Sequence, residues 1–356
     1  MRASVRICSI PYGKTFVLAM ALLAFFISAA EKAFRASPVQ SALPQPSLGI
    51  SHYFLDLKFS VLRAETQKSG PLDCVFLGTS QVDMAFDPEA FSLSYEKWTG
   101  KPIRSFNFGV AGLTLPSARA LMHILVKAYR PECIMIGVMP AQFGEEIIRP
   151  SEERILSSPW IRYHTGDFNV NGWMIENSMA YRYFLRFRQW MEQADYSSLV
   201  SRREAVMSPC GFANFKNPNS TRSLVVDPRR SARFKRKLRN FRVSSGRIAD
   251  FKAIMDYRRS VDMAVVEMPT HTVFKSFYGG GVKDHEETMK VIRTLTESRG
   301  LPFIPADDPG LYADELWLQS NHMNALGAER FSIWLGNKIG ESVQKGFMKD
   351  PVTRLP

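Results

Sequence analysis

Two short segments, far apart in the chain, carry residue types that could do nucleophilic chemistry. Residues 78–81 read Gly-Thr-Ser-Gln and place the Ser80 hydroxyl directly after an apolar run, where a turn at a strand end is expected. Near the carboxyl end, His322 stands in the segment Asn-His-Met-Asn-Ala-Leu-Gly-Ala, with Asn324 at the N-cap position of an expected helix. An imidazole that reaches a serine hydroxyl can take its proton and activate it. Taken singly, each segment is also compatible with an ordinary turn or a surface histidine.

The remaining histidines and the cysteines offer fewer candidates. His271 follows an apolar run in the segment Met-Pro-Thr-His and is a second candidate at the end of a strand. The cysteines are widely spaced and two of them lie inside apolar runs, so free thiols are expected at Cys8, Cys74, Cys133 and Cys210. Because no Cys or His cluster has the spacing of zinc ligands, the sequence predicts neither a metal nor an organic cofactor.

Apolar strands alternate with amphipathic helices from about residue 71, the pattern of a parallel sheet with crossover helices. We therefore predict an α/β fold, a three-layer, doubly wound parallel sheet whose reactive groups gather at the carboxyl ends of the strands. The expected strands cover residues 72–77, 103–108, 133–138, 263–268 and 301–305. The expected helices cover residues 88–98, 116–129, 247–259, 285–298 and 324–345.

The amino terminus carries a targeting signal. Arg2, Arg6 and Lys14 precede an uncharged apolar run over residues 15–30, which indicates a transmembrane anchor or a cleaved signal peptide. We favour the uncleaved anchor, and both alternatives place the body of the protein outside the cytoplasm. The expected organisation is a cytoplasmic basic tail, the membrane segment, a linker or stalk, an α/β domain with an insertion at 141–246, and a tail, bounded at 1–14, 15–30, 31–70, 71–346 and 347–356.

The chain is strongly basic, with a formal net charge of +12. Residues 229–247, within the insertion, contain nine Lys or Arg and no acidic residue. Such a run is either a solvated helix face or a surface for an anionic glycan or anionic lipid headgroups. The expected export disfavours nucleic acid as a partner. The aromatic stretch at 181–190 is expected mainly to pack in the core, with stacking on a sugar ring as the alternative.

Together these motifs resemble the SGNH (GDSL-like) hydrolase superfamily over residues 71–140 and 261–345. The resemblance implies a flavodoxin-like α/β fold, with Ser80 as the nucleophile and His322 as the general base. It also implies an oxyanion donor at Gly109 or Gly112, in the segment Asn-Phe-Gly-Val-Ala-Gly that follows the second strand. The final helix matches the family continuation of the histidine motif at Asn324, Gly327 and Ala328.

Two departures from the family pattern concern catalysis. Gln319 stands three residues before the histidine, where the family usually has aspartate, and glutamine can orient the ring but cannot neutralise an imidazolium. Asp314 or Glu315 could substitute, although neither has the family spacing. The oxyanion asparagine after the third strand is also absent, and Gln142 is the nearest amide. We count Gln142, Gln319, His271 and Asn324 as candidate substrate contacts.

The single anchor makes the chain similar to membrane-bound SGNH-like proteins of cell-envelope polysaccharide O-acylation. That resemblance implies a serine esterase or O-acyltransferase acting on an acylated polysaccharide or a small ester, on the periplasmic side of the inner membrane in a Gram-negative cell. It also implies a membrane acyltransferase as a partner. The alternative is a catalytically silent SGNH-fold protein that binds glycan or serves as a scaffold for an acyltransferase complex, and Gln319 supports this alternative.

Overall fold

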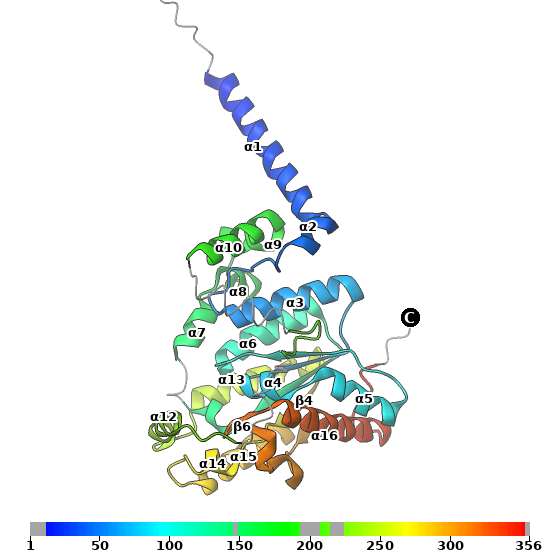
Figure 1. The fold of residues 1–356 in the computed structure, drawn as a ribbon, viewed down its shortest axis with the longest axis vertical. Coiled ribbons are helices and arrows are strands. Elements are labelled where there is room, and N and C mark those ends of the chain that lie inside the picture. The colour runs from blue at the N-terminus through cyan, green and yellow to red at the C-terminus, as the bar shows by residue number, and fades with distance from the viewer. Residues whose placement is uncertain (1–11, 145–148, 193–206, 214–223, 353–356) are drawn as a thin grey trace, which may run out of the picture.

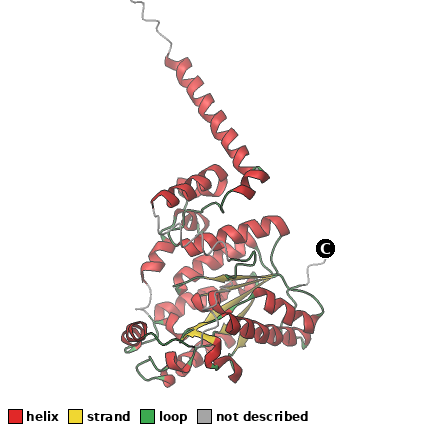
Figure 2. Ribbon diagram, in the orientation of Figure 1, coloured by secondary structure: helices red, strands yellow, loops and turns green. Residues whose placement is uncertain are grey.

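The computed structural model describes residues 12–144, 149–192, 207–213 and 224–352 of the 356-residue chain. At its centre is a parallel sheet in the order β2-β1-β3-β4-β5, drawn in Figures 1 and 2. The strands are β1 Cys74–Gly78, β2 Ser105–Gly109, β3 Cys133–Val138, β4 Asp262–Glu267 and β5 Phe303–Ile304. The order reverses next to β1, as in the flavodoxin-like doubly wound fold. The predicted fold class is therefore confirmed.

Alternate side chains of the strands point into two separate layers of core. Val75 and Leu77 of β1 face one layer and Phe76 faces the other. The first layer is covered by α3 Tyr53–Ser69, α6 Leu115–Ile124, α13 Ser245–Met255 and α15 Val282–Glu297. The second is covered by α4 Ser80–Ala85, α5 Pro88–Thr99 and α16 Ala325–Gln344. Both faces of the sheet are buried, as a three-layer fold requires.

The predicted helix ends are present at two places. Asp87 accepts hydrogen bonds from the amides of Glu89 and Ala90 at the start of α5, and Gly100 closes that helix with a φ of 72°. Asn324 caps α16 by accepting a hydrogen bond from the amide of Gly327. The helix predicted over 116–129 is less regular than expected, because α6 continues as a π-helical turn, η1, at Leu125–Tyr129.

The second half of the linker predicted over residues 31–70 belongs to the folded domain. Residues 53–69 form α3, whose Leu55, Phe59 and Leu62 are buried in the core at spacings of four and three residues. His52 caps the helix through its Nδ1. The Pro and Ser residues at 37–48 suggested a stalk, but the amphipathic pattern that follows them already belongs to the folded domain.

Helix α1, Tyr12–Arg35, is long and apolar enough by length and composition to cross a membrane, and Figure 1 shows it projecting from the domain. The basic residues Arg2 and Arg6 of the expected cytoplasmic tail lie outside the described residues. The helix extends five residues beyond the apolar run, where Glu31 and Arg35 form an ion pair at 2.6 Å. A short helix, α2 Ser37–Ala42, follows.

The described parts of the insertion, which exclude residues 145–148, 193–206 and 214–223, are mainly helical, apart from residues 207–213, where Met207 and Ala213 form an antiparallel bridge. It begins with the 3-10 turn η2 Pro140–Phe143 and continues with α7 Arg149–Leu156, α8 Pro159–His164, α9 Val170–Asn177, α10 Met179–Glu192 and α12 Pro228–Leu238. Helices α9 and α10 lie at the base of α1, whereas α12 lies at the far end of the domain (Figure 1). The aromatic stretch at 181–190 packs only in part, because Tyr183 and Leu185 are buried while Phe184, Phe187 and Trp190 are exposed.

Candidate active site

Ser80 is the first residue of α4 and lies where β1 ends. Thr79 is the N-cap, and its hydroxyl accepts a hydrogen bond from the amide of Gln81. The start of α4 rests directly on the ends of the strands, because a Cβ at Gly78 would collide with Val82 and a Cβ at Gly109 would collide with the Asp83 backbone. These glycines let the helix begin against the sheet, and so they set the height of the Ser80 hydroxyl above it.

His322 is held by a small antiparallel hairpin of β6 Trp317–Gln319 and β7 His322–Met323, which the sequence reading did not anticipate. The buried Trp317 fixes the first strand, and its indole N–H donates to the carbonyl of Leu311. The structure brings His322 to Ser80, with 2.8 Å between Nε2 and Oγ. Both side chains remain partly exposed. This distance is within the range in which a base can take a hydroxyl proton.

The other ring nitrogen of His322, Nδ1, has two competing neighbours. Gln319 Oε1 lies 3.1 Å away and Arg230 Nη2 lies 3.2 Å away. Gln319 Oε1 can only accept, so its hydrogen bond requires a proton on Nδ1 and leaves Nε2 free to accept from Ser80. Arg230 can only donate, so its hydrogen bond requires a bare Nδ1 and puts the proton on Nε2, the wrong tautomer for a base. The two neighbours thus favour opposite states of the site.

Arg230 comes from α12, inside the basic run, and was not among the site residues that the sequence predicted. Leu238 of this helix packs with Phe274 and Phe277 beyond β4, and Phe234 packs against the same cluster. Residues 230, 234 and 238 are four apart and therefore share one helix face. That spacing was readable in the sequence, because it places one arginine of the run on the apolar face that must pack.

Among the described contacts of His322 there is no carboxylate in the place of the aspartate that the SGNH resemblance implies. Asp314 pairs instead with His271 at 3.0 Å, and Glu315 uses its backbone carbonyl to accept from Asn324. The pKa of His322 is lowered to about 4, mainly by burial and in part by the nearby Arg230, while Asp83 opposes the shift. The ring is therefore neutral at pH 7.

The candidate substrate contacts separate into structural and available groups. His271 Nδ1 accepts from the amide of Val273, so its Nε2 carries the proton donated to Asp314. Both nitrogens are thereby occupied. Asn324 is occupied as well, by Gly327 and Glu315. Gln142 lies on η2 after β3, and its Oε1 accepts from the amide of Met139. Of the four, Gln319 alone contacts the His322 ring.

The two candidate oxyanion glycines differ in the same way. The amide of Gly109 donates to Asn107 Oδ1 at 2.9 Å, so it is already used. Gly112, with a φ of 75°, lies in the turn beyond β2, and within the described part of the chain its N–H has no acceptor. The N–H of Ser80, at the first position of α4, is likewise without an acceptor there. Gly112 and Ser80 are therefore the better candidate donors to an oxyanion.

A buried ion pair supports α4 from beneath. Lys58 of α3 lies 3.0 Å from Asp83, with both side chains almost fully buried, and it donates to the carbonyl of Asn107 at 2.8 Å. Asn107 in turn donates to the carbonyls of Val82 and Phe86. These contacts tie α3, β2 and α4 together three residues after Ser80.

Within the described ranges, no group of three or more His, Cys, Asp or Glu side chains could hold a metal ion.

Comparisons with known proteins give a fold likeness only. No family model and no curated protein matches the chain. A gut microbial diltiazem-metabolizing enzyme shares 12% identity at a TM-score of 0.30, over 65% of this chain and 36% of that enzyme. An inhibitor-bound aryl esterase of M. smegmatis shares 12% at a TM-score of 0.33, over 76% of this chain and 98% of the esterase. A Streptococcus pneumonia protein provisionally described as a platelet activating factor shares 9% at 0.37, over 91% and 98%. Similarities this low carry no argument about activity.

Proposed function

We propose that the chain is an SGNH-like serine acyl-ester hydrolase or O-acyltransferase. The observation that carries the proposal is the 2.8 Å contact between Ser80 Oγ and His322 Nε2 at the carboxyl edge of a doubly wound sheet. In this reading Ser80 is the nucleophile and His322 is the general base. The amides of Ser80 and Gly112 donate to the oxyanion.

The reaction needs the tautomer in which Nδ1 carries its proton and donates to Gln319. Nε2 then takes the Ser80 proton while Oγ attacks the ester carbonyl, and the imidazolium returns that proton to the leaving alcohol. The acyl group stays on Ser80 until water or a sugar hydroxyl, deprotonated by the same ring, attacks it. With water the product is a free acid, and with a sugar hydroxyl it is a new ester.

The basic charge and the apolar α1 support an acyl ester of an envelope or exported polysaccharide as the substrate. In this proposal α1 anchors the chain, the domain is extracytoplasmic, and a membrane acyltransferase is the partner. A reporter fused after Pro356 tests the topology. A reporter that is active only after export should be active in this fusion. The reason is that the positive residues before α1 retain the amino-terminal end in the cytoplasm and direct the rest of the chain outward. Cytoplasmic reporter activity would exclude this topology.

A second candidate function is a silent glycan-binding or scaffold protein. The observation that favours it is the environment of Nδ1, where a glutamine and an arginine stand and neither neutralises an imidazolium. A base in these surroundings is weak. The two functions differ in whether Ser80 forms and releases an acyl intermediate.

Hydrolysis of p-nitrophenyl acetate by the purified full-length protein separates the two candidates. Ser80→Ala should lower kcat/KM by about 10³-fold or more, since the nucleophile is lost. Ser298→Ala, on an exposed hydroxyl at the end of α15, is the matched control and should leave the rate unchanged. Wild-type hydrolysis that survives Ser80→Ala would contradict the proposed enzyme. Inert wild type and an inert Gln319→Asp variant, with glycan binding retained, would establish the scaffold.

A further inference from the structure

Arg230 is a half-buried cation without an anionic partner in the described part of the chain. Its Nη2 faces His322, and its buried Nε has no acceptor. The nearest acid along the helix, Asp227, uses Oδ1 to accept the amides of Arg229 and Arg230. The guanidinium lies over the Phe234 ring at 5.7 Å, a contact that holds its position without neutralising it.

An arginine withdrawn from water and left without an anion is costly, and this cost favours any oxyanion that can reach it. The planar guanidinium suits carboxylate and phosphate, which accept two parallel hydrogen bonds. An anion bound there would draw Nη2 away from Nδ1. The ring proton could then move, by exchange with solvent, from Nε2 to Nδ1. There Nδ1–H donates to Gln319, and Nε2 is free to accept from Ser80.

We propose that Arg230 is an oxyanion-binding site that selects esters carrying a nearby carboxylate or phosphate, and that this group switches His322 into its base-competent tautomer. This inference rests on the proposed function. Arg230 acts in it as a specificity and positioning residue, because it touches the substrate anion but not the reacting carbonyl. An empty site shifts the balance toward the tautomer with Nε2 protonated, which slows the attack of Ser80 on neutral esters.

Two esters test the selection: neutral p-nitrophenyl acetate and anionic mono-p-nitrophenyl succinate. Arg230→Gln should lower kcat/KM for the succinate ester at least about tenfold, the loss of one charge-assisted contact, while the rate on the acetate should rise, because the donor that competes with Gln319 for Nδ1 is removed. Arg259→Gln, an exposed arginine before β4, is the control and should alter neither rate. Equal losses on both esters in Arg230→Gln would overturn the selection.

Thermal unfolding tests the binding site without catalysis. Succinate and inorganic phosphate, each compared with chloride at equal ionic strength, should raise the Tm of Ser80→Ala and leave that of Arg230→Gln unchanged. The larger shift identifies carboxylate or phosphate as the preferred anion. If no ester is hydrolysed but the Arg230-dependent shift is present, the proposed function fails and the anion site stands. Absence of any shift would refute the site.

A different observation, at the other end of the molecule, carries a second inference. Seven large apolar side chains outside α1 are exposed along α9, α10 and the turn before α9: Phe168, Val170, Trp173, Phe184, Phe187, Trp190 and Met191. On α10 the exposed positions 184, 187 and 191 share one helix face. Several exposed large apolar side chains on two neighbouring helices point to a contact with another protein or a membrane.

The contacts at the base of α1 decide between those two partners. Glu31, directly after the apolar run 15–30, accepts hydrogen bonds from the amides of Met179 and Ala180 at 2.8 and 3.1 Å. Arg35 donates to the carbonyl of Asn177, and Phe34 stacks on Tyr183 at 4.9 Å. The first turn of α10 is thereby fixed at the level where the apolar helix ends, as Figure 1 shows.

We infer that the exposed face of α9 and α10 lies in the headgroup region of the bilayer that α1 enters. Trp and Phe side chains are favoured at that depth, and α10, with 14 residues, spans about 21 Å along it. The domain is then mounted rigidly on the membrane by α1, α9 and α10. Helix α12 lies at the far end of the domain from this surface, so its cations are free to meet a soluble anion.

Full-length protein reconstituted in vesicles with brominated acyl chains provides the test, because bromine quenches tryptophan that reaches the lipid. Wild-type emission should be quenched, and Trp173→Phe with Trp190→Phe should remove most of that quenching. Trp98→Phe, on α5 and 37% exposed, is the control and should leave the quenching intact. Quenching that is absent, or that persists in the double variant, would overturn the inference and assign this face to something other than lipid.

Discussion

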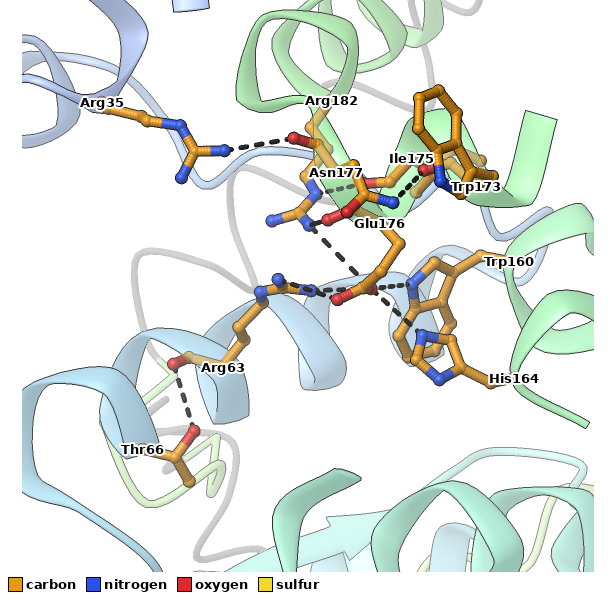
Figure 3. A network of polar contacts seen from close by, with 10 residues as sticks. All are labelled: Arg35, Arg63, Thr66, Trp160, His164, Trp173, Ile175, Glu176, Asn177 and Arg182. Atoms are coloured by element: carbon orange, nitrogen blue, oxygen red, sulfur yellow. Dashed lines mark hydrogen bonds and ion pairs between the residues drawn. The ribbon is translucent and has the colours of Figure 1, made fainter. Parts of the chain in front are cut away.

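Two clusters of charged and imidazole groups in this molecule are organised in opposite ways. In the insertion, Glu176 accepts from Arg63 at 3.0 and 3.1 Å, from Trp160 at 2.9 Å, and contacts His164 at 3.1 Å (Figure 3). Its surroundings hold the pKa of Glu176 well below its usual range, through His164 and Arg63 against the opposing effect of burial. At the sheet edge, His322 has a cation beside it and no described carboxylate contact.

The difference indicates that the Glu176 cluster stabilises the fold and that the His322 cluster binds a ligand. The Glu176 cluster joins α3, α8 and α9, and every group in it already has its partner, so it needs nothing from outside. The His322 cluster is incomplete in the isolated chain, since Arg230 lacks an anion and Nδ1 has two incompatible neighbours. Unsatisfied charge concentrated at one site is what a bound ligand can complete.

The largest expected effect on stability comes from breaking the complete cluster. Glu176→Gln should lower the free energy of unfolding by about 3 kcal/mol, because it leaves Arg63 and Arg182 without their carboxylate. Arg230→Gln should not lower it, since no ion pair is lost and a half-buried charge without a described anionic partner is removed. Denaturant unfolding of both variants makes the measurement. Equal destabilisation would show that the two clusters are not different in kind.

Supplying the missing charge should sharpen the comparison. Gln319→Asp places a carboxylate beside both Nδ1 and Arg230, which stabilises the imidazolium and neutralises the guanidinium. Hydrolysis of p-nitrophenyl acetate should rise about tenfold, a fraction of the roughly 10⁴-fold that the aspartate supplies in serine proteases. Gln319→Glu, with the same charge on a longer side chain, is a geometric control and should gain less. A rate that falls in Gln319→Asp would contradict the assigned role of His322.

The depressed pKa of His322 also predicts the pH dependence of stability. Its folded pKa of about 4 lies below the ordinary value of 6.5, so the unfolded chain binds more protons between these values. Stability should therefore fall as the pH is lowered from about 6.5 to about 4, by about 1.4 kcal/mol for each unit of pKa difference. His285, with a pKa lowered by burial to about 3, acts in the same direction. In Arg230→Gln the decline should be shallower. An unchanged slope would argue against the coupling.

The smallest effect is expected at the pair of His271 and Asp314. Asp314→Asn removes the charge that faces His271, but Asp314 is largely exposed and the pair is screened by solvent. Hydrolysis should change less than about threefold, because neither His271 nitrogen is available to a substrate. A large loss of activity would return His271 to the catalytic candidates.

The sequence allowed much of the frame to be predicted, and the reasons are local. Apolar runs located the five strands, and Asp87, Gly100 and Asn324 marked helix ends that the structure contains. Ser80 and His322 were each expected at the edge of the sheet from their local context, and the resemblance to SGNH hydrolases paired them.

The remaining features depend on contacts between distant segments. Arg230 contacts His322, which is 92 positions away, because the insertion folds back toward the carboxyl edge of the sheet. Lys58 contacts Asp83 from α3, a helix in the segment that was predicted as a linker. Neither approach follows from spacing along the chain. The one usable signal was the four-residue spacing of Arg230, Phe234 and Leu238. It predicts that these residues share one helix face, but not which residue Arg230 contacts.

The central claim is that Ser80 is a nucleophile activated by His322. A fluorophosphonate probe tests it directly, because it phosphonylates only serines whose hydroxyl is activated by a base. Mass spectrometry of the labelled full-length protein should find one adduct, on Ser80, that is missing in Ser80→Ala and strongly reduced in His322→Ala. It should increase in Gln319→Asp. Wild type and Gln319→Asp that both remain unlabelled, although folded and able to bind anions, would contradict the claim.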